Sequence, residues 1–247
     1  MNVTEILQIG GALSLGAIIQ SSSGFGFGLF VIPILLYFGF SLAPTVIIVV
    51  IGSAIQKVTA VKYLQEHLDW KEMLPFIIIG LVGLPLGIFA MSRISNMDQP
   101  VVKQVIGVVV LVMLALHWKG SIKSRDYVPK LWGYIAGFFT GLLNGFANIG
   151  GPPVVLWALA HQWSNRKMRG TILAFSLIFV PFQLALMLVT FGSEMFSPIL
   201  KAVVLSPMVL LGTWIGLKIG ERISQDHLRI YMQALLLFIA VSSVLKL

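Results

Sequence analysis

Two clusters of small polar residues and glycines interrupt apolar stretches of this sequence, and they are the residues best suited to bind a ligand. The first is Gln-Ser-Ser-Ser-Gly-Phe-Gly-Phe-Gly at 20–28, and the second is Asn-Gly-Phe-Ala-Asn-Ile-Gly-Gly-Pro-Pro at 144–153. Hydroxyl and amide groups donate hydrogen bonds without carrying charge, and glycines let backbone N–H groups come close to a ligand. A short apolar segment follows each interruption, and free N–H groups at the start of a helix bind anions. The pattern therefore predicts an anion site built from neutral groups.

The candidate substrate contacts are the polar residues and glycines of both interruptions, together with one proline and one lysine. They are Gln20, Ser21, Ser22, Ser23, Gly24, Gly26, Asn144, Asn148, Gly150, Gly151, Pro153 and Lys57. Proline at 153 suits the first position of a helix that starts there, because the N–H it lacks would be unpaired anyway. The alternative is a purely structural break, but three consecutive serines and a Pro-Pro pair are poor choices for packing alone.

Lys57 is the one cation within an apolar stretch, Ile-Gly-Ser-Ala-Ile-Gln-Lys-Val-Thr-Ala-Val at 51–61. Its charge could attract an anion into a vestibule on the cytoplasmic side. Alternatively, its long side chain could reach the nearby helix end and place the ammonium in water. The sequence favours neither interpretation.

Groups for catalysis or metal binding are missing from the apolar interior. The nine Asp and Glu residues and the four His residues lie in loops or near segment ends, whereas intramembrane proteases need buried aspartates or a His-x-x-x-His helix. Cysteine is absent, which excludes disulfides and thiolate sites. We expect no catalytic residue, no metal and no cofactor, and we expect that the protein is not an enzyme.

The elements that must hold these residues are membrane-spanning helices. Hydrophobic residues make up 57% of the 247 and charged residues only 11%, whereas a soluble domain carries roughly a quarter charged residues. The apolar segments lie at 3–20, 28–40, 43–63, 73–92, 100–118, 131–147, 153–163, 169–191, 199–221 and 227–246. A crossing needs about 20 apolar residues, so 28–40 and 153–163 are too short. The composition predicts an all-α membrane protein.

The basic residues indicate how these segments are oriented. The net charge of +8 does not indicate nucleic-acid binding, because the 17 Lys and Arg residues fall mostly between apolar segments. If each interruption is the tip of a re-entrant hairpin, thirteen of them lie on one side and four on the other. If each is a broken single crossing, the split is nine to eight. The positive-inside rule therefore favours hairpins, or an equivalent pair of full crossings, with the basic loops in the cytoplasm and both termini in the periplasm.

The two halves of the chain resemble each other. Gly16 matches Gly141 and Gly26 matches Gly151 at an offset of 125, and Gly83, Gly87 and Arg93-Ile94-Ser95 match Gly212, Gly216 and Arg222-Ile223-Ser224 at an offset of 129. Each half comprises one hairpin, which enters and leaves by the same face, and three crossings. Because the number of crossings is odd, the second half is expected upside down relative to the first. The predicted architecture is two inverted-topology repeats, 1–118 and 131–247, joined by a cytoplasmic linker at 119–130.

Glycines outside the two interruptions are expected to serve close helix packing. They are Gly83, Gly87, Gly212, Gly216 and the stripe Gly133, Gly137, Gly141 and Gly145.

Two repeated halves that each open with a Gly-rich break, SSSGFGFGLFVIP at 21–33 and NGFANIGGPPVVL at 144–156, resemble the sulfite exporter TauE/SafE family. The resemblance covers essentially the whole chain and includes Gly170-Thr171, where the first half has Pro44-Thr45 instead. It implies movement of sulfite, organosulfonates or related anions across the bacterial inner membrane. It does not imply which of these anions is the substrate.

We therefore expect a secondary transporter that exports a small anion by alternating access. A monoanion that leaves a negative interior gains about 2.3 kcal/mol per 100 mV, so export needs no carboxylate for coupling. An anion channel and a non-transporting membrane subunit of an enzyme complex remain as alternatives. The expected partners are the small anion and the lipid bilayer, with no nucleic acid, and a homodimer is left open.

Overall fold

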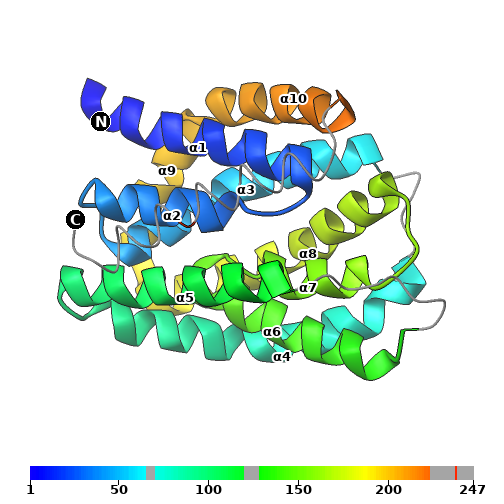
Figure 1. Ribbon diagram of the computed structural model, residues 1–247. Coiled ribbons are helices and arrows are strands. Elements are labelled where there is room, and N and C mark those ends of the chain that lie inside the picture. The colour runs from blue at the N-terminus through cyan, green and yellow to red at the C-terminus, as the bar shows by residue number, and fades with distance from the viewer. Residues whose placement is uncertain (65–69, 120–127, 223–236, 238–247) are drawn as a thin grey trace.

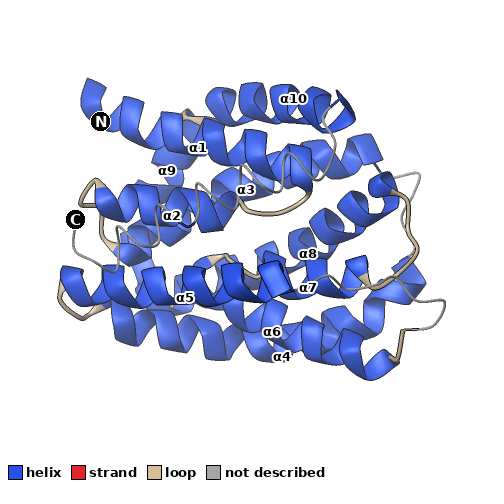
Figure 2. Ribbon diagram, in the orientation of Figure 1, coloured by secondary structure: helices blue, strands red, loops and turns tan. Residues whose placement is uncertain are grey.

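The computed structural model describes residues 1–64, 70–119, 128–222 and 237, and all regular structure within them is helical (Figures 1 and 2). The helices are α1 (Val3–Ser23), α2 (Phe27–Tyr37), α3 (Leu42–Leu64), α4 (Trp70–Ser95), α5 (Gln99–Lys119), α6 (Lys130–Ala147), α7 (Gly151–Leu159), α8 (Asn165–Phe191), the 3-10 turn η2 (Gly192–Met195), α9 (Phe196–Val204) and α10 (Ser206–Arg222). The predicted all-α class is confirmed. The predicted segment at 227–246 and most of the linker at 119–130 lie outside the described residues.

Within the described residues, four helical stretches are long and apolar enough to cross a membrane, as expected for a multi-pass protein. They are Val3–Ser23, Leu42–Leu64, Met73–Ser95 and Arg166–Val204, the last of which runs from α8 through η2 into α9. The helices α2 and α7 have only 11 and 9 residues. The prediction that a short helix follows each interruption is therefore confirmed.

Both interruptions are shorter than predicted. Ser21, Ser22 and Ser23 belong to the last turn of α1, where the hydroxyls of Ser22 and Ser23 lie 2.9 and 2.8 Å from the Ile19 carbonyl. The Ser23 hydroxyl also reaches the Phe25 carbonyl beyond the helix end, at 2.8 Å. Asn144 likewise belongs to α6, so the breaks comprise only 24–26 and 148–150.

Two helix boundaries also differ from the prediction. The helix α7 begins at Gly151, so Pro153 occupies its third position and not its first. The predicted segment 199–221 is two helices, because α9 ends at Val204 and α10 begins at Ser206 with Pro207 at its second position. A proline in the first turn is compatible with a helix start, because no N–H is needed there.

Glycines bring two pairs of helices together at backbone distance, as predicted. Along α6, Gly137, Gly141 and Gly145 lie against Phe76, Gly80 and Leu84 of α4, and Gly212 and Gly216 of α10 lie against Ser14 and Ile18 of α1. The contacts advance in the same direction along both members of each pair. The helices α6 and α4 are therefore parallel, as are α10 and α1.

The helix α3 is the central element of the fold. Its residues Val46 to Val50 are at most 2% exposed, and it contacts α1, α2, α8, α9 and α10. One end of the helical bundle, which we call the basic end, collects the end of α3, the start of α8 and the end of α10 (Figure 1). The start of α1 lies at the opposite end, where Glu5 pairs with Lys201 of α9.

Candidate functional site

The tips of the two helical hairpins share one backbone design. The N–H of Gly24 donates to the Gln20 carbonyl at 2.7 Å, and the N–H of Asn148 donates to the Asn144 carbonyl at 2.8 Å. Both capping residues adopt the left-handed conformation, with φ of 91° and 51°. Asn148 is the one non-glycine residue with positive φ in the described part of the chain. Gln20 and Asn144 therefore occupy equivalent positions, one turn before each tip.

The start of each short helix lies against the tip of the other hairpin. A side chain on Gly28, at the start of α2, would overlap the backbone carbonyl of Asn148. A Cβ on Gly151, at the start of α7, would lie 3.0 Å from the Cβ of Phe25. The two hairpins, which are far apart in the sequence, thus meet tip to tip.

A cavity of about 20 Å³ lies where the tips meet, with room for about one water molecule. Residues from both tips, from α3 and from α8 line it: Gln20, Gly24, Phe25, Gly26, Phe27, Gly28, Leu29, Lys57, Asn144, Asn148, Ile149, Gly151, Ile172 and Ser176. Seven of the twelve residues predicted from the sequence are among them, namely Gln20, Gly24, Gly26, Lys57, Asn144, Asn148 and Gly151.

The other five predicted residues do not line the cavity. The Ser21 hydroxyl accepts a hydrogen bond from Gln56 Nε2 at 2.9 Å, and Ser22 bonds within its own helix turn. The Ser23 hydroxyl lies 2.8 Å from the carbonyls of both Ile19 and Phe25. The Gly150 N–H donates to Asn144 Oδ1 at 3.2 Å. Pro153 is also outside the cavity lining. The serines point away because they continue α1, where successive residues face different directions.

Lys57 is the charged residue among the described residues that line this cavity. It is 2% exposed, so its side chain does not reach water. The alternative in which Lys57 places its ammonium in water at the helix end is therefore not what the structure shows. No ion pair of Lys57 is formed within the described chain, where Asp98, Glu194 and Glu221 are exposed and Glu5 pairs with Lys201. A buried ammonium without a carboxylate is costly unless an anion compensates it. The arrangement is suited to a ligand that brings the negative charge.

Two further buried groups at the cavity lack a hydrogen-bond partner among the described residues. They are Gln20 Oε1 and Asn144 Nδ2. The amide of Asn144 has a fixed orientation, because its Oδ1 accepts from Gly150 and leaves Nδ2 as the free donor. Unpaired buried polar groups are rare in native structures; five others occur elsewhere in the described chain, but these two line the cavity at equivalent positions of the two hairpins, and Asn144 Nδ2 is the donor of the two.

The start of each short helix is a weaker anion site than its position suggests. In α7, Pro152 and Pro153 have no N–H to donate, and the Gly150 N–H is already bonded to Asn144. In α2, the carbonyls of Ala147 and Asn148 face the helix start at Gly28. Lys57 is therefore the main source of positive potential in the cavity.

Sequence reasoning missed three polar residues that line this cavity or lie near it. Ser53 accepts a hydrogen bond from Asn148 Nδ2 at 2.9 Å, and Ser176 of α8 contributes to the lining. The position of Ser53 could have been inferred, because it lies one helical turn before Lys57 and on the same face. Arg169 was counted as a loop cation but is only 3% exposed.

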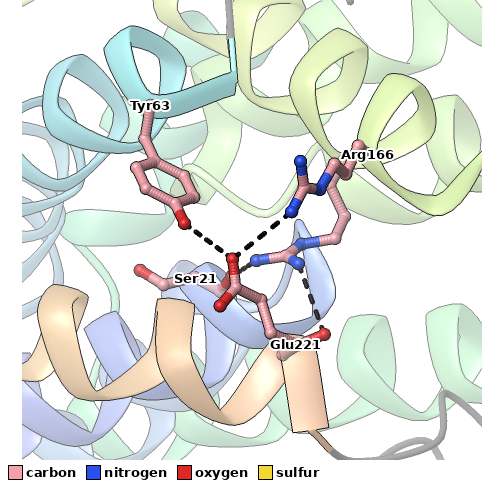
Figure 3. Close-up of polar contacts among 6 residues, drawn as sticks. Ser21, Tyr63, Arg166 and Glu221 are labelled. Carbon is pink, nitrogen blue, oxygen red and sulfur yellow. Dashed lines mark hydrogen bonds and ion pairs between the residues drawn. The ribbon is translucent and has the colours of Figure 1, made fainter.

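A layer of polar contacts covers the first hairpin tip at the basic end (Figure 3). Arg169 donates to the carbonyls of Ser21 and, at 3.5 Å, Gly220. Beside it, the hydroxyl of Tyr63 donates to Glu221 at 2.6 Å, and Arg166 pairs with the same carboxylate at 3.7 Å. We call these contacts the basic-end layer. It joins α1, α3, α8 and α10.

Substitution of Asn148 by glycine and by alanine should separate its side chain from its backbone conformation. Both variants lose the hydrogen bond to Ser53, but only alanine strains the positive φ. The alanine variant should therefore be less stable than the glycine variant by about 1 kcal/mol or more. Thermal unfolding in detergent measures the difference, with Ser53→Ala as the control for the hydrogen bond alone. Equal stability of the two variants would contradict the role of the left-handed cap.

Comparisons with known proteins identify one family and two related transporters. The family model described as "Sulfite exporter TauE/SafE" matches residues 9–243. A probable membrane transporter protein of Methanocaldococcus jannaschii is 25% identical over 241 residues, which cover 89% of this chain and 88% of that protein. A probable sulfite/organosulfonate exporter TauE of Cupriavidus necator is 23% identical over 180 residues, or 71% of this chain and 67% of that protein. No solved structure matches the chain.

Proposed function

Because the chain belongs to the sulfite exporter TauE/SafE family, whose members are membrane transporters, we propose that it exports a small sulfur-containing anion across the bacterial inner membrane. Sulfite and small organosulfonates are the substrate class. The observation that carries the proposal is the cavity lined by both hairpin tips and by Lys57, a buried cation without a carboxylate partner in the described chain. A bound anion would neutralise the charge of Lys57.

Two inverted repeats, 1–118 and 131–247, are part of the proposal. The helices α1 and α6, which open the halves, run in opposite directions (Figure 1), and each packs in parallel on a helix of the other half. Gln56 and Gln183 lie 127 positions apart, and each donates its amide to the first helix of a hairpin, at Ser21 and at the Asn144 carbonyl. This offset lies between the values of 125 and 129 found for the glycines. The correspondence supports a common plan for both halves.

Alternating access is the mechanism that we propose for these halves. The cavity has room for about one water molecule, so passage of an anion through it requires a change of conformation, as alternating access supplies. Loading a larger anion requires the tips to separate. On the cytoplasmic side this separation would break the basic-end layer, in which Arg169 holds the carbonyl of Ser21.

The orientation follows from charge. Lys62, Arg166, Lys167 and Lys218 belong to the basic end, and the positive-inside rule assigns that end to the cytoplasm. The N-terminus would then lie in the periplasm. No carboxylate is buried in the part of the chain that the structure describes, so export driven by the anion gradient and the membrane potential is the simplest arrangement.

The function is tested with purified full-length protein in liposomes. Vesicles loaded with sulfite, methanesulfonate or a carboxylate of similar size are diluted into buffer at controlled membrane potential. We expect saturable release of a sulfur anion, faster with a negative lumen, and little release of the carboxylate. Flux that grows linearly with concentration at channel-like rates would indicate a channel. Flux equal to that of protein-free vesicles for every anion would contradict transport.

A further inference from the structure

We propose that the cavity selects anions with one negative charge over anions of similar size and shape with two. This inference rests on the proposed function and specifies its substrate class: hydrogen sulfite or an organosulfonate would be carried, and sulfate or the sulfite dianion would be rejected. The groups around the cavity support it in three steps.

The first step is the number of charged groups. Of the buried residues in the described chain, only Lys57 and Arg169 carry charge. Arg169 is not part of the cavity lining, and its guanidinium is engaged by the carbonyls of Ser21 and Gly220. Among the described residues, the cavity therefore has one cationic side chain, which carries at most one positive charge.

The second step is the nature of the remaining polar groups. The free donor of Asn144 and the hydroxyl of Ser176 can each bond to an anion oxygen, and Gln20 presents an unpaired carbonyl oxygen; all three groups are neutral. The helix starts add little, because prolines at 152 and 153 remove two N–H groups from α7. The cavity thus offers an anion several neutral polar groups but only one cationic side chain among the described residues.

The third step is the cost of unbalanced charge. A monoanion and the Lys57 ammonium form a neutral pair inside the protein. A dianion would leave one negative charge uncompensated at a site whose lining residues Gln20, Lys57, Asn144 and Asn148 are each at most 7% exposed. Buried charge is strongly unfavourable unless paired. Neutral donors that fit both anions equally do not remove this difference.

Methanesulfonate and sulfate are suitable probes, because both are tetrahedral sulfur anions that differ by a methyl group in place of a charged oxygen. Each is added as a competitor in the liposome assay at neutral pH, where their charges are fixed. We expect the concentration of methanesulfonate that halves transport of the sulfur anion to be lower than that of sulfate by about tenfold or more. A Gln20→Lys variant adds a second cation at the cavity and should lower the ratio of the inhibitory concentration of sulfate to that of methanesulfonate. Gln20→Met is the control for the size of the side chain.

The outcomes separate this inference from the function on which it rests. Equal inhibition by both anions, or stronger inhibition by sulfate, would overturn charge selection and leave anion transport in place. If neither the sulfur anions nor the two competitors are transported or bound, the proposed function itself fails. The comparison in the wild-type protein decides the matter even if the Gln20→Lys variant does not fold.

Discussion

Gly141→Leu is expected to prevent recovery of folded protein from membranes. A Cβ at Gly141 would overlap the carbonyl of Gly80 on α4, and this neighbour is backbone that cannot move aside. Leucine is a good helix former, so the loss would come from packing between α4 and α6. The cost should exceed about 3 kcal/mol, above the range of most overpacked cores. Size-exclusion chromatography of a fluorescent fusion in detergent measures the recovered fraction.

The matched control is Gly11→Leu. Gly11 also lies within an apolar helix, but a Cβ there meets no atom within 4 Å. This variant should be recovered like the wild type, because replacing a helical glycine tends to stabilise the helix. Normal recovery of Gly141→Leu would show that α4 and α6 are not packed as closely as the structure has them.

Lys57→Met is expected to lower anion flux by about a hundredfold while leaving the protein folded. Removing the cation deletes the main positive charge at the cavity, and hydrogen bonds to a charged group contribute about 1.5–3 kcal/mol. Methionine keeps the length of the side chain. Because an apolar replacement of a buried charge is often neutral or stabilising, the melting temperature should stay unchanged or rise. Flux in liposomes and thermal unfolding are measured on the same preparation.

Lys62→Met serves as the control, because Lys62 lies on the same helix but is exposed near its end. Its loss should change flux by less than about threefold, since exposed charges contribute little. Flux of Lys57→Met above half that of the wild type would exclude Lys57 as the charge that binds the anion. A lowered melting temperature would instead assign Lys57 a structural role.

Most of the fold could be predicted, because it depends on apolar length. Composition identifies an all-α membrane protein, and the short segments after the interruptions are the short helices α2 and α7. The exact helix ends could not be predicted. Serine suits either a loop or the last turn of a helix, and whether Ser22 and Ser23 bond to the Ile19 carbonyl depends on the backbone itself.

The candidate site could be predicted in part. The glycines and amides of both interruptions are local features of the sequence, and the structure brings most of them to one cavity. The neighbours from other helices have no such signal. Ser176 and Arg169 come close only because α8 packs beside the first hairpin. Long-range packing of this kind is not encoded in the spacing of a single segment.

The parallel pairing of α1 with α10 has a consequence for biosynthesis. About 35 residues are synthesised between the end of α4 and the start of its partner α6. About 180 residues are synthesised between the end of α1 and the start of its partner α10. At translation rates of roughly 5–20 residues per second, synthesis of this second stretch lasts on the order of 10–40 s. During this time the face of α1 that will receive Gly212 and Gly216 has no partner. A nascent chain that stops before Ser206 would expose this face to membrane quality control.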